Sequence, residues 1–458
     1  MTNIDANIGY VDVADPRLGP ELLSNIVDRG KRLLSSIKSV GISTISVDRV
    51  ITTEREIGVL LEEFSRNNCC GIIIRTAWFL RSNAIVGIAQ RSHLPCLIWA
   101  TPNQNDPGFE GLALSHGALD EVGIAHKIHY GDTSESSIKK IINWAKACGL
   151  KQKLMNAVYG EIGGRCLEMI PGSSDFNQLR KIFGLHVDNI EQWSLIHKSE
   201  EIPDSQWRPV ADRWKEAFGD FRASKDSLEK SAKLYLAGHQ MFQERNWDFA
   251  GIQCQLEMID NYLAPCLPVA MWNEDGFTVS CETDINNALG MFVAHYFTGK
   301  SAMFADIFHY NVEQNIIHAL NCGTAAPSNA GDMKDIQIIE QSPLQGSWDD
   351  VRKCSLCKGG CCTHFVMPPG PVTFIRFGRI DGRYVIHLEK GKAIEHKHDD
   401  GILEGLGGVW PFAYIRLDDD VNPESFIENM RSHHAVIARS ECVDAVAEFA
   451  RLTNIPVL

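Results

Sequence analysis

The chain has 458 residues, 44% of them hydrophobic and 22% charged, which is enough apolar material for about three globular domains. Its formal net charge of −14 argues against a general binder of nucleic acids or anionic membranes, because such proteins cluster basic residues against phosphate. Apolar runs much shorter than the roughly 20 residues that span a bilayer, and a first segment without the pattern of a signal peptide, predict a soluble, cytoplasmic protein.

The first 150 residues alternate short apolar runs with amphipathic stretches. They predict strands at 8–13, 43–47, 71–75 and 94–99, with helices between them at 21–37, 54–64 and 82–90. Strands that alternate with helices over short connections indicate βαβ units and a parallel sheet, whose ligands lie beyond the carboxyl ends of the strands. The turn at 14–19 lacks the G-x-G-x-x-G spacing, which argues against a nicotinamide-dependent dehydrogenase.

The rest of the chain predicts two more domains. A strand at 154–159 and a helical region at 207–246 indicate a second α/β unit. Strand-like runs at 371–377 and 384–388 flank a turn, which is typical of an antiparallel β module, and the chain closes with a strand at 434–438. We therefore predict an α/β protein with N-terminal and central Rossmann-like parallel-sheet domains (1–152 and 153–345) and a mainly antiparallel β domain (346–458).

Two carboxylates and one imidazole stand out at the ends of predicted strands: Glu282, Asp306 and His434. Such a trio can bind a hard or borderline divalent cation and leave coordination positions open. The chain contains 58 acidic residues and 16 histidines, so a trio of this kind is easily found by chance. Composition alone therefore does not establish the site.

The same residues fall within a longer pattern. Its segments resemble the core signature of the L-fucose isomerase family of metal-dependent aldose–ketose isomerases, which are related to L-arabinose isomerase: 281–287, 290–291, His295, 298–299, 304–306 and 316–323. Upstream, 159–164 is similar to the loop that opens the family's second domain, and 434–437 with 455–457 is similar to its closing segment. The resemblance covers most of the chain and is patchy at 190–250 and 345–400.

The resemblance implies a function and a set of roles. Glu282, Asp306 and His434 would hold a divalent metal, most often Mn²⁺ in this family. The two carboxylates would be the catalytic pair that moves a proton between C1 and C2 of an open-chain sugar, with the metal stabilising the cis-enediolate. The family's N-terminal domain caps the metal of the next subunit, so the resemblance also implies a homo-oligomer, a hexamer.

Each of these residues also has a plainer structural interpretation. Glu282 can be a carboxylate at a helix start, stabilised by the helix dipole, and Asp306 can be a turn residue. His433 is the rival of His434, which we favour because it directly precedes the apolar run that the family pattern requires. His318 is expected to be structural or to orient a ligand. Because the arabinose branch of the family uses an extra histidine, His318 also stays a candidate metal ligand.

Three residues are candidates for contact with the sugar. Arg17 matches a family arginine that reaches a sugar hydroxyl across a subunit boundary, and Trp78 matches an aromatic that packs on the sugar. Trp410 is the third candidate. A surface arginine and core tryptophans are the alternatives.

Arg165 departs from the family pattern, which has small or apolar residues after Gly163–Gly164. A guanidinium beside a sugar pocket would bind phosphate or sulfonate through two parallel hydrogen bonds. This hypothesis makes an anionic hexose such as sulfoquinovose the substrate, in place of a fucose-like or arabinose-like sugar. The alternative is an ion pair between Arg165 and Glu161 or Glu168.

Fourteen cysteines in so long a chain do not make a disulfide scaffold, so most are expected to be reduced, buried thiols. One closely spaced group lies on a Gly-rich segment: Cys354, Cys357, Cys361, Cys362 and His364. Such spacing can form a tetrahedral Zn²⁺ site. A conventional zinc finger needs a well-separated second pair, so reduced thiols in a loop are the alternative.

The sequence thus predicts a Mn²⁺-dependent ketol isomerase. Two alternatives stay open. One is a non-catalytic sugar-binding or regulatory protein on the same fold, against which the presence of two metal-bound carboxylates argues. The other is a sugar epimerase, which would use the same enediolate.

Overall fold

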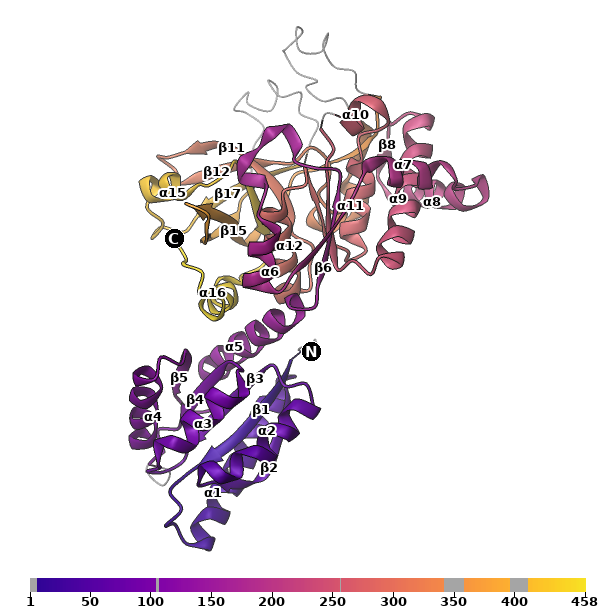
Figure 1. Ribbon diagram of the computed structural model, residues 1–458. Helices are drawn as coiled ribbons and strands as arrows, with labels where there is room; N and C mark the ends of the chain where they lie inside the picture. The colour runs from indigo at the N-terminus through magenta and orange to yellow at the C-terminus, as the bar shows by residue number, and fades with distance from the viewer. Residues whose placement is uncertain (1–5, 104–106, 256, 342–357, 396–410) are drawn as a thin grey trace. The chain divides into compact units, whose positions relative to one another are not determined.

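The computed structural model describes residues 6–103, 107–255, 257–341, 358–395 and 411–458 (Figure 1). The chain divides into two compact units, 1–153 and 154–458. The predicted boundary at 345 lies outside the described residues, so the three-domain division stays a prediction. None of the described helices combines the length and the apolar character that crossing a lipid bilayer requires.

Residues 1–153 form a parallel sheet with helices in the connections, as predicted. The strand order is β2-β1-β3-β4-β5, and the neighbouring strands pair in parallel. The strands are β1 (Asn7–Val13), β2 (Ser43–Ile51), β3 (Gly71–Thr76), β4 (Cys96–Ala100) and β5 (His126–Tyr130). The helices are α1 (Pro20–Ser39), η1 (Glu54–Glu56), α2 (Ile57–Arg66), α3 (Ser82–Ser92), α4 (Phe109–Glu121) and α5 (Glu135–Leu154). β3 is buried along its whole length, as a strand covered on both faces should be.

A buried ion pair joins β3 to β1 in this unit. Arg75 on β3 is fully buried, and its Nε donates to Oδ1 of Asp12 on the neighbouring strand β1 (2.5 Å). Its Nη2 donates to the carbonyl oxygen of Ile26 (2.7 Å), and the hydroxyl of Tyr10 donates to the same Asp12 oxygen (2.9 Å). The sheet thus holds a buried charge whose hydrogen-bond partners come from the same unit.

The second unit begins with another parallel sheet, in the order β10-β9-β6-β7. Its strands are β6 (Val158–Ile162), β7 (His186–Ile190), β9 (Phe249–Ile252) and β10 (Val279–Cys281). The strand predicted at 154–159 was wrong at its start, because α5 continues through Leu154. Leu150 and Leu154 are both buried and lie four residues apart, so this apolar run follows the helical period.

The connections of this unit are mainly helical. They contain η2 (Cys166–Glu168), η3 (Ile170–Gly172), α6 (Phe176–Phe183), α7 (Gln192–Glu200), α8 (Asp204–Ala217), α9 (Lys225–Glu244), α10 (Glu257–Asn261), α11 (Cys266–Glu274) and α12 (Ile285–Thr298). A small sheet, β14-β13-β8, joins β8 (Asp220–Phe221), β13 (Gln337–Glu340) and β14 (Cys361–His364). The helical region predicted at 207–246 is thus two helices, α8 and α9, with β8 between them.

The antiparallel module is a closed barrel, in the order β11-β12-β17-β16-β15-β18. Its strands are β11 (Met303–Asn311), β12 (Ile316–Leu320), β15 (Gly370–Ile380), β16 (Arg383–Ala393), β17 (Phe412–Leu417) and β18 (His434–Ala438), followed by the helix α16 (Val443–Leu452), with α15 (Pro423–Asn429) between β17 and β18. The antiparallel character is confirmed. The module is larger than predicted, because β11 and β12 come from the segment that we had placed in the central domain.

Helix α12 joins the parallel sheet to the barrel. It packs against β9 and β10 on one side and against β15 and β18 on the other. A helix enclosed in this way should be apolar on nearly every face, and 285–294 is buried throughout. Gly290 lets the barrel approach closely, since a Cβ there would lie 3.0 Å from Cγ2 of Val436. The carboxyl end of β10 is thereby brought beside the barrel strands.

Candidate active site

Glu282 lies in the turn between β10 and α12, at the carboxyl end of the central sheet. Its φ is +57° and that of Thr283 is +47°, in the left-handed region that residues with a side chain seldom adopt. The hydroxyl of Thr283 donates to the carbonyl oxygen of Gly164, and Asp284 caps α12 by accepting from the amide of Asn287 (2.9 Å). Backbone strain of this kind persists where the surroundings fix it, and it is common at functional sites.

Asp306 and His434 lie on neighbouring barrel strands. The antiparallel register of β11 and β18 pairs them directly. Directly opposed residues of such a pair project to the same face of the sheet, so their side chains are neighbours.

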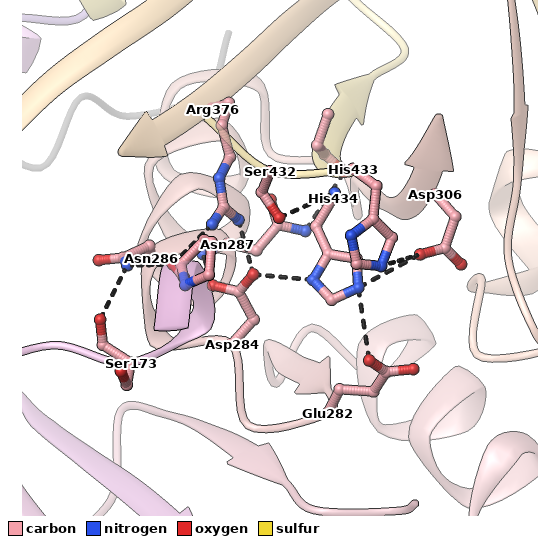
Figure 2. A network of polar contacts seen from close by, with 12 residues as sticks. Ser173, Glu282, Asp284, Asn286, Asn287, Asp306, Arg376, Ser432, His433 and His434 are labelled. Carbon is pink, nitrogen blue, oxygen red and sulfur yellow. Dashed lines mark hydrogen bonds and ion pairs between the residues drawn. The ribbon is translucent and has the colours of Figure 1, made fainter. Parts of the chain in front are cut away.

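His434 joins the two carboxylates (Figure 2). Its Nε2 lies 3.2 Å from Oδ1 of Asp306 and 3.4 Å from Oε2 of Glu282. The imidazole is fully buried, whereas the side chains of Glu282 and Asp306 are 12% and 22% exposed. The structure therefore brings together the three residues that the sequence singled out, from three elements far apart in the chain.

Asp284 orients His434. Its Oδ2 lies 2.8 Å from Nδ1 of His434 and accepts from Nη1 of Arg376 (2.7 Å), and all three side chains are fully buried. Arg376, on β15, also donates through Nη2 to the carbonyl oxygen of Pro171 (2.9 Å). With Nδ1 facing Asp284, the Nε2 of His434 faces Glu282 and Asp306 (Figure 2).

The titration of these groups follows from burial and charge. Burial raises the pKa of Glu282 to about 8, against the opposing hydrogen bond with His434. Burial acts in the same direction on Asp284, but the charge of Arg376 and the bond with His434 outweigh it and lower the pKa of that carboxyl. Burial alone would lower the pKa of His434, yet hydrogen bonds with Asp284, Asp306 and Glu282 raise it well above its ordinary value. Asp284 is therefore charged at neutral pH, while Glu282 can carry a proton.

The donor set fits a divalent cation. Nε2 of His434 is buried without a hydrogen-bond partner of good geometry among the described residues, although two carboxylates face it. A histidine held through its other ring nitrogen by a carboxylate is the arrangement by which proteins orient metal-ligating imidazoles. Two carboxylates and one imidazole suit several divalent cations, so these ligands do not choose Mn²⁺ over its competitors.

His433, the rival of His434, also lies at the site. Its Nε2 is 3.7 Å from Oδ1 of Asp306, and its side chain is 55% exposed. Asp306, His433 and His434 offer ligand atoms within 4.8 Å of one another. Burial, together with the charge of His434, lowers the pKa of His433. We retain His434 as the proposed ligand because it is the member that contacts both carboxylates.

A pocket of about 80 Å³ opens beside Glu282. Its lining includes Glu161, Arg165, Cys166, Ser173 and Glu282. Arg165 is exposed and forms no ion pair with Glu161 or Glu168 within the part of the chain that the structure describes. Burial raises the pKa of Glu161 to about 7. The pocket thus combines an available guanidinium with the carboxylate of the cation site.

Arg17 and Trp78 belong to the 1–153 unit. Both follow strands whose ends are paired, since Val13 of β1 lies opposite Thr76 of β3. The guanidinium of Arg17 is 73% exposed and its Nε lies 2.8 Å from Oδ1 of Asp15. Trp78 is half-buried and packs against a small apolar cluster of the same unit. Their roles toward the sugar stay predictions.

His318 lies on β12, and its ring packs against His309 and Tyr414 with centroid distances of 4.8 and 4.9 Å. Its predicted role in orienting a ligand stays a prediction. Trp410, the third candidate for contact with the sugar, lies outside the described residues.

The predicted zinc cluster is only partly described. Cys361 and Cys362 are consecutive residues of β14 and enter different apolar clusters, since neighbouring side chains of a strand project to opposite faces. One ion would therefore not bind both. His364 closes the same strand, whereas Cys354 and Cys357 lie outside the described residues. Zinc binding stays a prediction.

Two residues that orient the site were not found from the sequence. Asp284 lies in the segment 281–287 that resembles the family signature but was given no role, and Arg376 was not considered at all. The signal for Asp284 was its spacing, two residues after Glu282. Arg376 was detectable only as a charged residue within an otherwise apolar predicted strand.

Comparisons with known proteins show similarity to sugar isomerases. Residues 319–458 match the family model of the C-terminal domain of L-fucose isomerase. The sulfoquinovose isomerase of Alkalicoccus urumqiensis is 20% identical over 398 residues, covering 84% of this chain and 85% of that protein. The L-fucose isomerase of Klebsiella pneumoniae subsp. pneumoniae is 23% identical over 506 residues, covering 91% and 84%. That of Haemophilus influenzae strain PittEE is 22% identical, covering 84% and 74%.

Among solved structures, a periplasmic solute-binding protein of an ABC transporter from Actinobacillus succinogenes 130z, with bound D-allose, is 11% identical. The match covers 64% of this chain and 91% of that one, with a TM-score of 0.17, too low to define a shared fold.

The parallel sheets, the barrel and the matched C-terminal domain define an α/β protein of the aldose–ketose isomerase class. The matched C-terminal domain, together with relatives similar over most of the chain, supports its place in the L-fucose isomerase superfamily.

Proposed function

We propose that this isomerase acts on a hexose that carries an anionic group, of the sulfoquinovose kind, and that it uses a divalent cation, Mn²⁺ by preference. The observation that carries the substrate class is the position of Arg165 in the same pocket as Glu282, without a carboxylate partner among the described residues. Relatives named sulfoquinovose isomerase, similar over most of this chain, support the same substrate class.

Glu282, Asp306 and His434 would hold the cation, whose positive charge, when bound, stabilises the negative charge that develops on the two sugar oxygens. Asp284 and Arg376 hold the imidazole of His434 in the orientation that binding requires. The substrate itself supplies C1 and C2, between which one proton moves.

One carboxylate would take the weakly acidic proton from C2 and return it to C1, while the other handles the hydroxyl proton. Burial raises the pKa of Glu282 to about 8 in the cation-free protein, and a bound cation would hold this carboxyl in the ionised form that can accept a proton. The two carboxylates share His434, so their titrations are coupled.

Arg165 would bind the anionic group. The guanidinium is planar and can donate two parallel hydrogen bonds to sulfonate or phosphate oxygens. Ser173 also lines this pocket, and its hydroxyl, which donates to the carbonyl oxygen of Ile170 (3.0 Å), could accept a hydrogen bond from a sugar hydroxyl.

The experiment is a turnover panel with added Mn²⁺, with and without EDTA, in which NMR detects the ketose. The panel holds sulfoquinovose, glucose 6-phosphate, D-glucose, L-fucose, L-arabinose and D-arabinose. We expect chelator-sensitive ketose formation from the anionic sugars.

The matched variants are Arg165→Leu and Arg208→Leu, the second on an exposed arginine of α8 paired with Asp204. Arg165→Leu should lower kcat/KM for the anionic sugar at least 100-fold and leave neutral sugars unaffected, while Arg208→Leu should change neither. Equal losses for both kinds of sugar in Arg165→Leu would contradict the anionic substrate.

The other outcomes identify the alternatives. Ketose from L-fucose or an arabinose alone would make the substrate neutral, and inversion at C2 without ketose would indicate an epimerase. Cation binding without turnover of any sugar would favour a sugar-binding protein. Measuring the mass in solution tests the predicted homo-oligomer.

A further inference from the structure

A row of buried thiols runs behind Glu282. Cys254 follows β9 and Cys281 ends the neighbouring parallel strand β10, where Ile252 and Cys281 are paired. Their Sγ atoms lie 3.3 Å apart, and Sγ of Cys322 lies 3.7 Å from that of Cys281. All three are free cysteines. Neither the sugar chemistry nor the cation site described above uses these thiols.

The row reaches the substrate pocket through Cys166. This residue lines the same pocket as Glu282. The hydrogen bond with Cys254 and burial raise the pKa of the Cys166 thiol, so Cys166 borders the entrance and is not itself the reactive thiol. Its Sγ also lies 3.0 Å from the carbonyl oxygen of Gln255. A small molecule in the pocket therefore meets Cys166 first, and Cys254 and Cys281 follow behind it.

The inner pair is close to disulfide geometry and tied to the active carboxylate. A disulfide brings two sulfur atoms to about 2.05 Å, so Cys254 and Cys281 would approach by roughly 1.3 Å. Cys281 is bonded to Glu282, which already has a φ of +57°. Shifting the end of β10 by this amount would move Glu282 out of position toward His434, and displacements of about 1 Å are enough to lower activity strongly.

We propose that Cys254 and Cys281 are a peroxide-sensitive dithiol whose disulfide reversibly switches off the cation site. Hydrogen peroxide that enters past Cys166 oxidises the thiol of Cys254 to a sulfenic acid and releases one water. The thiol of Cys281, whose Sγ lies 3.3 Å from that of Cys254, attacks this sulfur, forms the Cys254–Cys281 disulfide and releases the second water.

In sum, two thiols lose two electrons and two protons, and one peroxide becomes two waters. A dithiol reductant reverses the change. The loss of activity rests on the proposed function, whereas the disulfide and the loss of cation binding can be measured without it.

The experiment treats the full-length protein with hydrogen peroxide, then maps disulfides by mass spectrometry and measures Mn²⁺ binding by calorimetry and isomerase turnover. We expect a Cys254–Cys281 disulfide, at least a tenfold loss of Mn²⁺ affinity and of turnover, and recovery of both with dithiothreitol. Substrate in the pocket should slow the oxidation.

The variants are Cys254→Ala and Cys166→Ala, with Cys96→Ala, a buried cysteine of the 1–153 unit, as the matched control. Cys254→Ala should make Mn²⁺ binding insensitive to peroxide, Cys166→Ala should still form the Cys254–Cys281 disulfide, and Cys96→Ala should respond as the wild type does. Disulfide mapping of the wild type needs no variant to fold.

Peroxide treatment that leaves Cys254 and Cys281 reduced, or that forms their disulfide without loss of Mn²⁺ binding, would overturn the proposal. If no panel sugar is turned over, the proposed function fails, but disulfide mapping and Mn²⁺ binding still decide whether this switch exists.

Discussion

Each of the two units contains a buried arginine–aspartate ion pair, and the two pairs have different roles. Arg75 and Asp12, 0% and 6% exposed, lie 2.5 Å apart, and Asp12 also accepts from the hydroxyl of Tyr10. Arg376 and Asp284, both 0% exposed, lie 2.7 Å apart, and the same carboxylate oxygen also contacts His434. The first pair fixes two strands of one sheet, whereas the second passes its orientation to an imidazole that faces two further carboxylates. The two pairs thus differ in the residue that contacts the aspartate: Tyr10 in the first pair and the site residue His434 in the second.

Removing either aspartate should have the largest effect on stability. Asp12→Ala and Asp284→Ala each leave a buried guanidinium without its counterion, which should lower the unfolding free energy of the affected unit by about 3–5 kcal/mol. Asp220→Ala breaks the exposed pair with Arg222 and should cost less than about 1 kcal/mol. Urea unfolding measures all three. Losses from the buried pairs no larger than the Asp220→Ala loss would show that water reaches them.

The next substitution separates the two pairs by function. Asp284→Asn keeps the shape of the side chain but removes the charge that orients His434, so it should weaken Mn²⁺ binding about 10–100-fold. Asp12→Asn, the matched change in the other pair, should leave Mn²⁺ affinity within about twofold of the wild type. Calorimetric titration of both variants measures this. Equal weakening by the two substitutions would mean that Asp284 acts through stability alone.

The sequence predicted the fold class because hydrophobic periodicity is a local property. Four strands of the first sheet are apolar runs between amphipathic stretches, and they were placed within a few residues. The strand β5 was not predicted, because its sequence HKIHY is largely polar and only one of its residues is buried. Leu154 was misplaced because an apolar residue at the end of a helix also fits the start of a strand. The antiparallel module was predicted without β11 and β12. These two strands pair with strands about a hundred residues later in the chain, and no local sequence pattern reveals such pairing.

The residues of the candidate site also fall into those that local motifs reveal and those that only packing reveals. Glu282, Asp306 and His434 were recognised by their motifs, and the structure brings them together. Arg376 was missed because its importance lies in one contact with Asp284, across 92 residues of sequence. Burial of a charge, and the partner that makes it tolerable, become visible only when the elements are packed.

Cation binding should depend on pH through Glu282 and not through Asp284. Burial raises the pKa of Glu282 to about 8, so at lower pH a proton must leave before a cation can bind. Mn²⁺ affinity should therefore fall about tenfold from pH 7 to pH 6, and further if His434 releases a proton too. The pKa of Asp284 is lowered by Arg376, so that carboxylate is ionised throughout this range. Calorimetry in two buffers of different ionisation enthalpy counts the released protons.

Glu282→Gln is the control for this titration. The variant should bind Mn²⁺ more weakly at every pH, and its remaining binding should depend less on pH between 6 and 8. An unchanged slope would assign the released proton to another group.

The smallest predicted effect concerns Glu161. Its carboxyl is partly buried and, unlike that of Asp284, has no arginine partner among the described residues. Burial raises its pKa to about 7, while Asn189 donates to it (3.2 Å) and opposes the shift. The folded protein then keeps a proton that the unfolded chain loses above about pH 4.5. Stability conferred by this proton is complete below that pH and is lost as the pH rises to 7.

Glu161→Gln removes this titration. Relative to the wild type, the variant should gain about 1 kcal/mol of unfolding free energy between pH 4.5 and pH 8, a figure reduced for the partial exposure of the group. Urea unfolding at pH 4.5, 6 and 8 measures the difference. Glu168→Gln, at an exposed position in η2, should follow the wild-type profile. If the unfolding free energies of Glu161→Gln and the wild type changed in parallel with pH, the ionised form of Glu161 would be stabilised in the folded protein by another group or by water, as Arg376 stabilises ionised Asp284.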